Sequence, residues 1–329
     1  MIGSIARRAL LAGALGLSAL LTASCGGDEQ ANPNHIVFAV LPAESQAAAE
    51  PLWAPLIDDL EAETGLDVEL RFVPNYTVLV ETMRAGQIQV AWMSALPALD
   101  ATRRSNGHII GRIMNREGET HYRSVLITQA DSGITLQDVM ACGRRYSFGM
   151  GDARSTSGTL APLAFLFGPA EIEPSECFRE VRPANHQANA LAVANGQVDV
   201  ATNNDVGLLF TERQNPRAFA NIRVIWESPP IPESAIVVRG DVDPAVTERI
   251  RSFFMTYGDT PEERQVLDGL EYGGFQAADD SYLDPVREME ASVALMEARR
   301  SGDQARIAAA QTAYNEIHAR VAAAQEVQP

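Results

Sequence analysis

The sequence predicts an α/β protein built from two similar lobes, and two observations carry this prediction. From residue 36 onward, apolar runs alternate with amphipathic runs, a βαβ rhythm that predicts parallel strands covered by helices. The motif Gly-Gln-Ile-Gln-Val-Ala at 86–91 returns as Gly-Gln-Val-Asp-Val-Ala at 196–201, and Phe38 returns as Phe148. Both pairs are 110 residues apart (196 − 86 and 148 − 38). This constant spacing predicts that the second lobe repeats the design of the first.

The individual elements are read from periodicity and from their stop signals. In the first lobe we expect strands at 36–41, 68–73, 88–92 and 109–114, and helices at 51–63, 77–85 and 96–104. Gly65 and Gly86 end the first two helices, since glycine readily adopts the left-handed conformation of a helix end. A strand at 146–150 and a helix at 160–167 open the second lobe, strands at 123–128 and 221–226 cross between the lobes, and a helix at 244–257 belongs to the first lobe.

The C-terminal segment predicts a long helix with one apolar seam. The seam consists of residues at alternating three- and four-residue steps: Ile307, Ala310, Tyr314, Ile317 and Val321. Such a seam packs against another apolar surface. We expect it to pack on the body of the protein, and a homodimer contact through this helix is the alternative.

The composition argues against nucleic acid and anionic membranes as partners. The formal net charge is −17, and all 26 basic residues are arginine. An acidic surface disfavours nucleic acid and an anionic membrane surface as partners. An acidic protein can still bind a small anion, because the local dipoles of a closed cleft, and not the net charge, decide such binding.

The N-terminus has the pattern of an export signal. Arg7 and Arg8 precede an apolar stretch at 9–21, which ends close to Cys25. The stretch is too short for a transmembrane helix. It is similar to a bacterial lipoprotein signal, whose cysteine becomes the lipidated N-terminus, although Thr22 stands where a large aliphatic residue is usual. A signal that is simply cleaved is the alternative. No later run is apolar enough to span a bilayer.

Two further cysteines, Cys142 and Cys177, follow the export signal. In an exported protein such a pair more often forms a disulfide than two free thiols. Each precedes a predicted strand of the second lobe, which makes a bridge plausible.

Three consecutive hydroxyls, Ser155, Thr156 and Ser157, stand where the helix at 160–167 begins. The first N–H groups of a helix lack internal partners and carry partial positive charge. Hydroxyls beside them make a site for a tetrahedral oxyanion, which we call the oxyanion cup. An ordinary helix cap is the alternative, since serine and threonine are common there.

Catalysis and metal binding find less support. A catalytic site would use Ser155 or Ser157 as the nucleophile and His186 as the base. No Gly-x-Ser-x-Gly pattern, the turn typical of such nucleophiles, surrounds either serine. The histidines are scattered, and no Cys/His pair has ligand spacing, so neither a metal nor a cofactor is expected.

Ligands of open parallel sheets bind beyond the carboxyl ends of the strands. The repeat therefore places the loops at Ser45, Tyr76 and 93–94 on one wall of a cleft, and those at 155–157, His186 and 203–205 on the other. Two such lobes behind an export signal are typical of a hinged solute receptor.

In several stretches the sequence resembles the phosphonate-binding subunits of bacterial ABC importers, within the phosphate/phosphite/phosphonate receptor family. The matching stretches are 44–46, 73–76, 90–92, 151–158, 189–204, 225–229 and 253–263. The resemblance covers roughly residues 36 to 282. It implies a type II periplasmic-binding-protein fold, with two βαβ lobes of mostly parallel strands joined by two crossing strands, plus long C-terminal helices.

The resemblance also implies site residues. Ser155, Thr156 and Ser157 correspond to the family's phosphonate-oxygen ligands, and Tyr76 and His186 complete the shell. The chemistry agrees, because hydroxyls, a phenol and an imidazole can all donate to the three oxygens of a PO₃ group.

The sequence departs from the members that bind 2-aminoethylphosphonate. These use a tyrosine and two carboxylates around the ammonium group, and we assign the corresponding positions to Met93, Val206 and Ser234. Asp205 and Glu233 are one residue away from the last two. Together with Ser45, these residues form the candidate specificity pocket. The pattern favours an alkylphosphonate or phosphite, with 2-aminoethylphosphonate or phosphate as the alternative.

The resulting organisation has six parts: a lipoprotein signal at 1–24, a tether at 25–35, the first part of lobe 1 at 36–122, lobe 2 with its hinge strands at 123–225, the return to lobe 1 at 226–282, and C-terminal helices at 283–329. The resemblance implies a high-affinity, periplasmic or cell-surface receptor that delivers its ligand to an ABC permease and ATPase, with membrane contact only through a lipid anchor. A receptor that reports to a signalling partner would use the same cleft.

Overall fold

The computed structural model describes residue 32 and residues 34–327 of the chain, and residues from Asn34 onward form one compact unit. Cys25 and the expected signal lie outside the described residues. Among the described residues, no helix combines the length and apolarity needed to cross a membrane.

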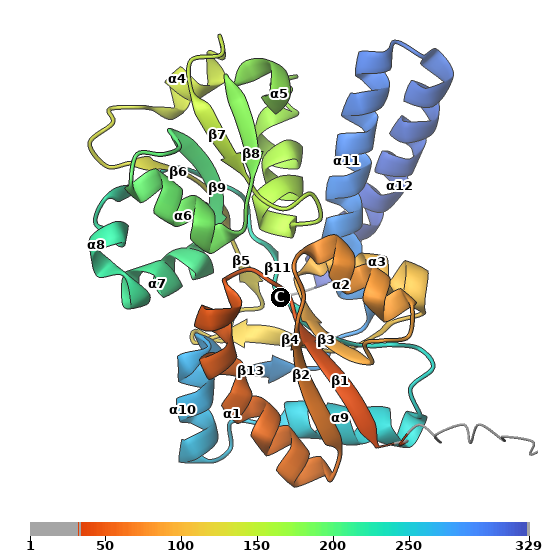
Figure 1. Ribbon diagram of the computed structural model, residues 1–329. Coiled ribbons are helices and arrows are strands. Elements are labelled where there is room, and N and C mark those ends of the chain that lie inside the picture. Colours follow the sequence, from red (N-terminus) through yellow and green to blue (C-terminus); the bar gives the residue numbers. More distant parts are fainter. Residues whose placement is uncertain (1–31, 33, 328–329) are drawn as a thin grey trace, which may run out of the picture. The chain divides into compact units, whose positions relative to one another are not determined.

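Lobe 1 is built on a six-stranded sheet in the order β13, β4, β12, β3, β1, β2 (Figure 1). Its strands are β1 (His35–Val40), β2 (Asp67–Phe72), β3 (Val90–Met93), β4 (His108–Asn115), β12 (Ala235–Val238) and β13 (Tyr272–Gln276). β1, β2 and β3 are parallel, whereas β12 runs antiparallel between β3 and β4. The helices are α1 (Gln46–Thr64), α2 (Tyr76–Arg84), α3 (Ala95–Ser105), α9 (Pro244–Thr256) and α10 (Pro261–Gly269).

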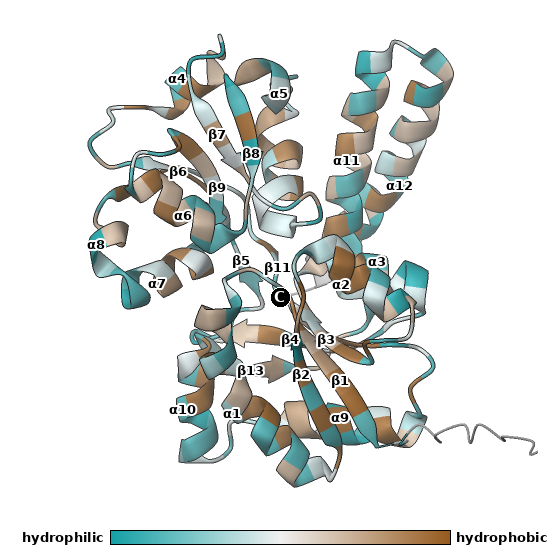
Figure 2. Ribbon diagram, viewed as in Figure 1, coloured by the Kyte–Doolittle hydropathy of each residue, from teal (hydrophilic) through white to brown (hydrophobic). Residues whose placement is uncertain are grey.

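The two faces of this sheet are covered by different helices, because successive side chains of a strand point to opposite faces. Phe38 and Val40 of β1 pack in one core with α1 and α9, whereas Val37 and Ala39 pack in the other with α2 and α3. Figure 2 shows the apolar residues along the strands of this sheet.

Lobe 2 is built on a five-stranded sheet in the order β10, β6, β9, β7, β8. Its strands are β6 (Ser124–Gln129), β7 (Ser147–Met150), β8 (Glu180–Pro183), β9 (Val200–Asn204) and β10 (Ile222–Glu227). Its helices are α4 (Leu136–Met140), η1 (Thr156–Leu160), η2 (Leu163–Phe167), α5 (Pro174–Cys177), α6 (His186–Ala194), α7 (Asp205–Gln214) and α8 (Pro216–Phe219). Thus the α/β prediction of two βαβ lobes is confirmed.

The registers of the two sheets repeat at the spacing that the sequence shows. Phe38 pairs with Val90 between β1 and β3, and Phe148 pairs with Val200 between β7 and β9. Both partners of the second pair therefore stand 110 residues after those of the first (148 − 38 and 200 − 90).

The expectation for the crossing strands was wrong in one respect. The segments at 123–128 and 221–226 correspond to β6 and β10, which pair antiparallel within the sheet of lobe 2. The chain passes between the lobes just before β6 and just after β10. There β5 (His121–Tyr122) and β11 (Ile231–Pro232) form a separate two-stranded ladder. These strands are too short to give a periodic pattern in the sequence.

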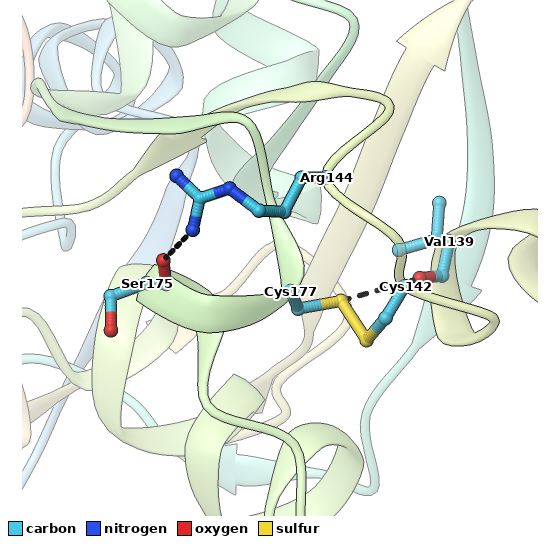
Figure 3. The surroundings of a disulfide bond; sticks show 5 residues. All are labelled: Val139, Cys142, Arg144, Ser175 and Cys177. Carbon is cyan, nitrogen blue, oxygen red and sulfur yellow. Dashed lines mark hydrogen bonds between the residues drawn. A yellow bond between two sulfur atoms is a disulfide. The ribbon is translucent and has the colours of Figure 1, made fainter.

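Lobe 2 contains the disulfide between Cys142 and Cys177, with an S–S distance of 2.10 Å (Figure 3). Cys177 is buried beside Phe148, Phe167 and Phe178, so the bridge borders the aromatic core of the lobe. It joins α5 to the segment that follows α4, away from the carboxyl ends of the strands.

The C-terminal segment forms a helical hairpin of α11 (Asp284–Ser301) and α12 (Gln304–Val327), preceded by the short helix η3 (Asp280–Leu283). Ile317 and Val321 of the predicted seam are buried, and ion pairs from His318 and Arg320 reach α11. This agrees with packing on the protein's own body. A homodimer contact through α12 stays a prediction.

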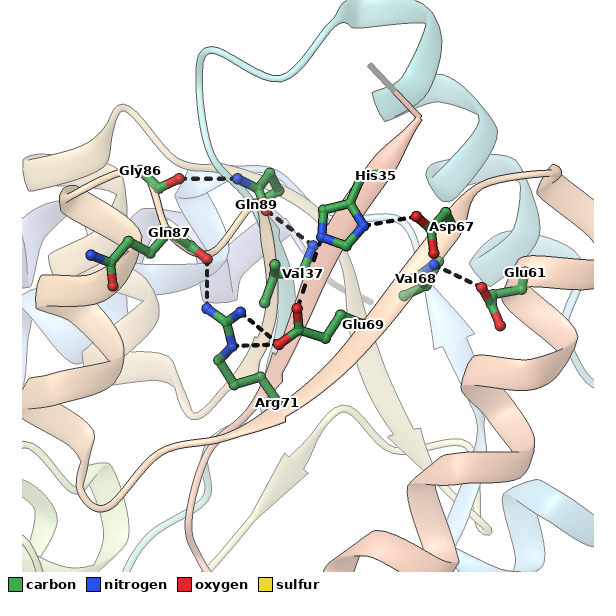
Figure 4. Close-up of polar contacts among 10 residues, drawn as sticks. All are labelled: His35, Val37, Glu61, Asp67, Val68, Glu69, Arg71, Gly86, Gln87 and Gln89. Carbon is green, nitrogen blue, oxygen red and sulfur yellow. Dashed lines mark hydrogen bonds and ion pairs between the residues drawn. The ribbon is translucent and has the colours of Figure 1, made fainter. Parts of the chain in front are cut away.

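A polar network joins β1, β2 and the segment before β3 in lobe 1 (Figure 4). The Nδ1 atom of His35 lies 3.0 Å from Asp67, Arg71 pairs with Glu69, and Gln89 accepts from the N–H of Val37. His35 and Asp67 are the first residues of the parallel strands β1 and β2, so their contact lies at the end of the sheet opposite to the carboxyl ends, which face lobe 2.

Candidate functional site

Three helices of each lobe begin directly after a parallel strand, and their first residues face the space between the lobes. The capping residues are Ser45, Asn75 and Ser94 in lobe 1 and Ser155, Asn185 and Asn204 in lobe 2. Each lobe 2 position stands 110 residues after its lobe 1 counterpart (155 − 45, 185 − 75 and 204 − 94). The repeat therefore directs six helix N-termini toward one region, where the helix dipoles favour an anion.

A cavity of about 60 Å³ lies in this region, lined by residues of both lobes. Among the residues that the sequence assigned, its lining includes Tyr76, Ser155, Ser157, His186, Val206, Glu233 and Ser234. It also includes Ser94 and Asn204, which belong to loops that the repeat placed on the two walls of the cleft. Further polar and aromatic side chains of the lining were not assigned from the sequence: Glu44, Trp53, Trp92, Tyr122 and Tyr272.

The oxyanion cup forms where β7 ends and η1 begins. Gly151 and Gly158 pack backbone to backbone there, and a Cβ atom on Gly151 would lie 2.5 Å from the Cα of Gly158. Only glycine allows this approach. The Oγ atom of Ser155 accepts the N–H of Gly158 at 2.9 Å, so this hydroxyl also caps the helix. The helix begins at Thr156, earlier than the apolar run at 160–167 predicted, and contains two π-helical stretches, which are frequent at functional sites.

His186 links the two serines of the cup. Its Nε2 atom lies 3.4 Å from the Oγ of Ser155 and 3.3 Å from the Oγ of Ser157. The side chain of Asn204 donates to the same Ser157 hydroxyl at 3.3 Å. The cup thus brings hydroxyl, imidazole and amide groups together from three consecutive βα connections of lobe 2.

Burial sets the charge of these groups. It lowers the pKa of His186 to about 4, so the imidazole is neutral at pH 7. Burial also raises the pKa of the Tyr76 phenol well above its ordinary value, helped by the nearby Glu44, while a hydrogen bond with Ser155 opposes the shift. The cup therefore offers neutral donors rather than fixed positive charges.

Thr156 has a different environment from its neighbours. It is fully buried and is not among the residues that line the cavity. Its Oγ1 atom accepts the N–H of Leu96, at the start of α3 in lobe 1, at 2.8 Å. Its hydroxyl thus connects the cup with the opposite lobe, and a direct ligand contact stays a prediction.

Two carboxyl groups also line the cavity, Glu44 and Glu233. Burial raises the pKa of both Glu44 and Glu233 to about 7. Tyr122, whose pKa burial also raises, stands between Glu233 and the hydroxyls of the cup, with which it interacts. Among the described residues that line the cavity, none is an arginine.

Three members of the predicted specificity pocket lie elsewhere. Met93 is fully buried in the core beneath α2 and α3, because neighbouring residues of a strand face opposite ways and its neighbour Trp92 lines the cavity. Asp205 turns its carboxylate to the backbone N–H groups of Arg123 and Val206, at 3.0 and 2.9 Å. Ser45 is exposed, and its N–H donates to Gln187 of lobe 2 at 3.0 Å.

Further contacts join the lobes beside the cup. Asp152 accepts the N–H of Tyr76 at 3.3 Å, and the Nε atom of Arg154 donates to Asp100 of α3 at 2.6 Å. Arg213 of α7 pairs with Glu271 of lobe 1 at 2.7 Å. The two walls of the cavity therefore contact each other directly in this structure.

The comparisons with known proteins identify the family of the chain. Residues 38–283 match the family model described as "ABC transporter, phosphonate, periplasmic substrate-binding protein". The chain belongs to this family. Its members are transport receptors, and the fold expected from the resemblance is confirmed by the solved structures.

Several relatives of this periplasmic substrate-binding protein are informative. A phosphonates-binding periplasmic protein of Escherichia coli is 38% identical over 274 residues, which cover 83% of this chain and 80% of that protein. A binding component of an ABC phosphonate transporter from Pseudomonas aeruginosa has a solved structure with a TM-score of 0.84 and 32% identity, covering 88% of this chain and 99% of that one. A Prochlorococcus marinus protein, PhnD1, solved in complex with methylphosphonate, has a TM-score of 0.71 at 19% identity, covering 78% and 97%, and so shows the shared fold.

Proposed function

We propose that this chain is the extracytoplasmic receptor of an ABC importer and that it binds a phosphonate in the cavity between its lobes. The PO₃ group would lie on the oxyanion cup, with Ser155, Ser157, Tyr76 and His186 as donors. The observation that carries this proposal is the convergence of the two serine hydroxyls on His186 at the start of a buried helix that lines the cavity.

The chemistry of the cup supports an anion of this kind. Hydroxyl, phenol and imidazole groups can each donate a hydrogen bond, and donors aimed at a charged oxygen are stronger than neutral pairs. The helix dipole adds positive potential at the same place. In a closed cavity this potential is screened less than in water, so neutral donors suffice.

Two candidate ligands differ in the substituent on phosphorus, so the residues around that substituent determine which one is preferred. Val206 and Ser234, which were assigned to the carboxylate positions of members that bind 2-aminoethylphosphonate, line the cavity, and this supports an alkylphosphonate or phosphite. Glu44 and Glu233 support a second candidate, a phosphonate with an ammonium group such as 2-aminoethylphosphonate. Because the pKa of both acids is about 7, they can be neutral beside an alkyl group or charged beside an ammonium group.

The test is calorimetric titration of the purified receptor with methylphosphonate, ethylphosphonate, phosphite, phosphate and 2-aminoethylphosphonate at one pH and salt concentration. We expect at least one phosphonate to bind, and replacement of Ser155 and Ser157 together by alanine to abolish binding. Each lost hydrogen bond to a charged oxygen costs about 1.5–3 kcal/mol. Affinity of that variant within tenfold of the wild type would refute the cup. The tightest ligand of the series decides between the two candidates.

The membrane attachment of the receptor is a separate proposal. We infer that Cys25 carries lipid and tethers the chain beside its permease and ATPase, because the sequence before it is similar to a lipoprotein signal. The intact mass of the mature protein should then show a lipidated residue 25, and Cys25→Ser should release the protein from membranes. An unmodified N-terminus beyond Cys25 would exclude the anchor. A signalling role in place of transport stays an untested alternative.

A further inference from the structure

Ser94 of lobe 1 has a buried hydroxyl with no partner among the described residues. Its side chain is 7% exposed and lines the cavity. Leaving a buried hydroxyl unpaired costs about 1–3 kcal/mol, so such a group is expected to have a partner that the protein itself does not supply.

The helix that Ser94 begins explains why its hydroxyl has no partner. A serine at this position normally accepts the N–H of the second or third helical residue. Ser94 makes no such cap. The N–H of Leu96, the second helical residue of α3, instead donates to Thr156 of the cup at 2.8 Å. The contact between the lobes has thus replaced the cap and left the Ser94 hydroxyl available.

The counterpart in lobe 2 behaves differently. Asn204 caps α7 by accepting the N–H of Gly207 at 2.7 Å, and it donates to Ser157 at 3.3 Å. Both polar atoms of its side chain therefore have a partner within the protein. Of this symmetry-related pair, only Ser94 has a polar group without a partner, and the Leu96–Thr156 contact places it opposite the cup.

A second donor lies on the same wall. The indole Nε1 of Trp92, two residues before Ser94, is buried, has no partner in the described part of the chain and belongs to a residue that lines the cavity. An indole N–H can only donate. Two unpaired groups able to donate on one wall call for an acceptor-rich ligand, and a PO₃ group is one.

We infer that Ser94 and Trp92 are further hydrogen-bond donors of lobe 1, in addition to Tyr76, to the oxygens of the bound phosphonate. This inference rests on the proposed function. It assigns to lobe 1 a ligand contact that forms only when both the ligand and the opposite cup are in place, so these residues determine affinity in the closed form.

The test compares Ser94→Ala with Ser105→Ala, using methylphosphonate as the probe. Ser105 ends the same helix, and its hydroxyl is also buried without a partner in the described residues, but it does not line the cavity. We expect Ser94→Ala to weaken binding roughly 10- to 100-fold, Ser105→Ala to bind like the wild type, and Ser94→Thr, which keeps the hydroxyl, to retain most of the affinity.

Trp92→Phe provides an independent test. It removes the indole N–H while keeping an aromatic ring, and Trp226→Phe in lobe 2, outside the cavity lining, is its control. We expect Trp92→Phe to weaken the binding of methylphosphonate in calorimetry and Trp226→Phe to bind it like the wild type. Affinity is the readout because Trp53 also lines the cavity and would keep a fluorescence response. Equal affinities of Ser94→Ala and Ser105→Ala would overturn the inference, whereas a wild-type protein that binds no phosphonate would overturn the proposed function first.

Discussion

At the scale of single residues, Glu233 couples the site to pH. Its side chain is 5% exposed, and one carboxylate oxygen accepts the N–H of Ser234 at 2.6 Å. Burial raises its pKa from 4.5 to about 7, so between these values the folded protein holds a proton that the unfolded chain releases. Its contribution to stability is therefore full below pH 4.5 and is lost as the pH rises through 7.

We predict that Glu233→Gln stabilises the ligand-free protein at pH 8 and has little effect at pH 4.5. The shift from 4.5 to about 7 corresponds to roughly 3 kcal/mol at alkaline pH. Urea unfolding of both proteins at the two pH values measures it, with the exposed Glu117→Gln as control. A variant that is less stable than the wild type at pH 8 would show that the ionised carboxylate has a stabilising partner.

The residues of the site were predictable where a motif or the internal repeat marked them. Tyr76 and His186 occupy equivalent first positions of α2 and α6, each after an asparagine cap, so the repeat alone paired them. Met93 was assigned from the resemblance, as the position of a family tyrosine. It lies in the core while its neighbour Trp92 lines the cavity, because successive residues of a strand face opposite ways. Tyr122 was missed because a two-residue strand carries no periodic pattern.

At the scale of elements, the strands for which the sequence analysis proposed bounds are observed within two residues of those bounds, whereas the short strands β5 and β11 were not predicted. The expected strand at 36–41 is observed as β1, His35–Val40, because its apolar run is buried on both faces. β12 runs antiparallel in the middle of the lobe 1 sheet. Its direction depends on the two-stranded ladder of β5 and β11, whose strand β11 lies just before it in the chain. No local sequence pattern predicts this ladder.

The start of η1 shows the same limit. The hydroxyl-rich stretch at 155–159 favours turns and caps by its local chemistry. In the structure it forms the first turn of a helix, because Thr202 donates to the carbonyl of Gly158 at 2.7 Å and Ser124 donates to that of Ser157 at 2.6 Å. Contacts from two neighbouring strands thus fix the geometry of the cup. A local sequence pattern cannot predict these contacts, because the residues that make them are distant in the chain.

At the scale of the whole molecule, closure is the property that the structure makes testable. The ion pair between Arg154 and Asp100 joins the loop before the cup to α3 of lobe 1, and neither residue lines the cavity. Asp100 is 6% exposed, so losing its partner leaves a nearly buried charge unpaired. The pair should therefore favour the closed form whether or not a ligand is present.

We predict that saturating ligand contracts the wild-type protein in small-angle scattering, and that Arg154→Ala expands the ligand-free form and weakens every ligand by the same factor. The factor is uniform because apparent affinity scales with the population of the closed form, whatever the ligand. For a partly exposed ion pair we expect about 1 kcal/mol, or roughly fivefold. Arg71→Ala should leave closure unchanged, because Arg71 pairs with Glu69 of its own strand within lobe 1 (Figure 4). Asp100→Asn and the double variant complete a cycle in which the two effects should not add. Additive effects would deny the pair a role in closure, and an unchanged radius at verified saturation would contradict the hinge itself.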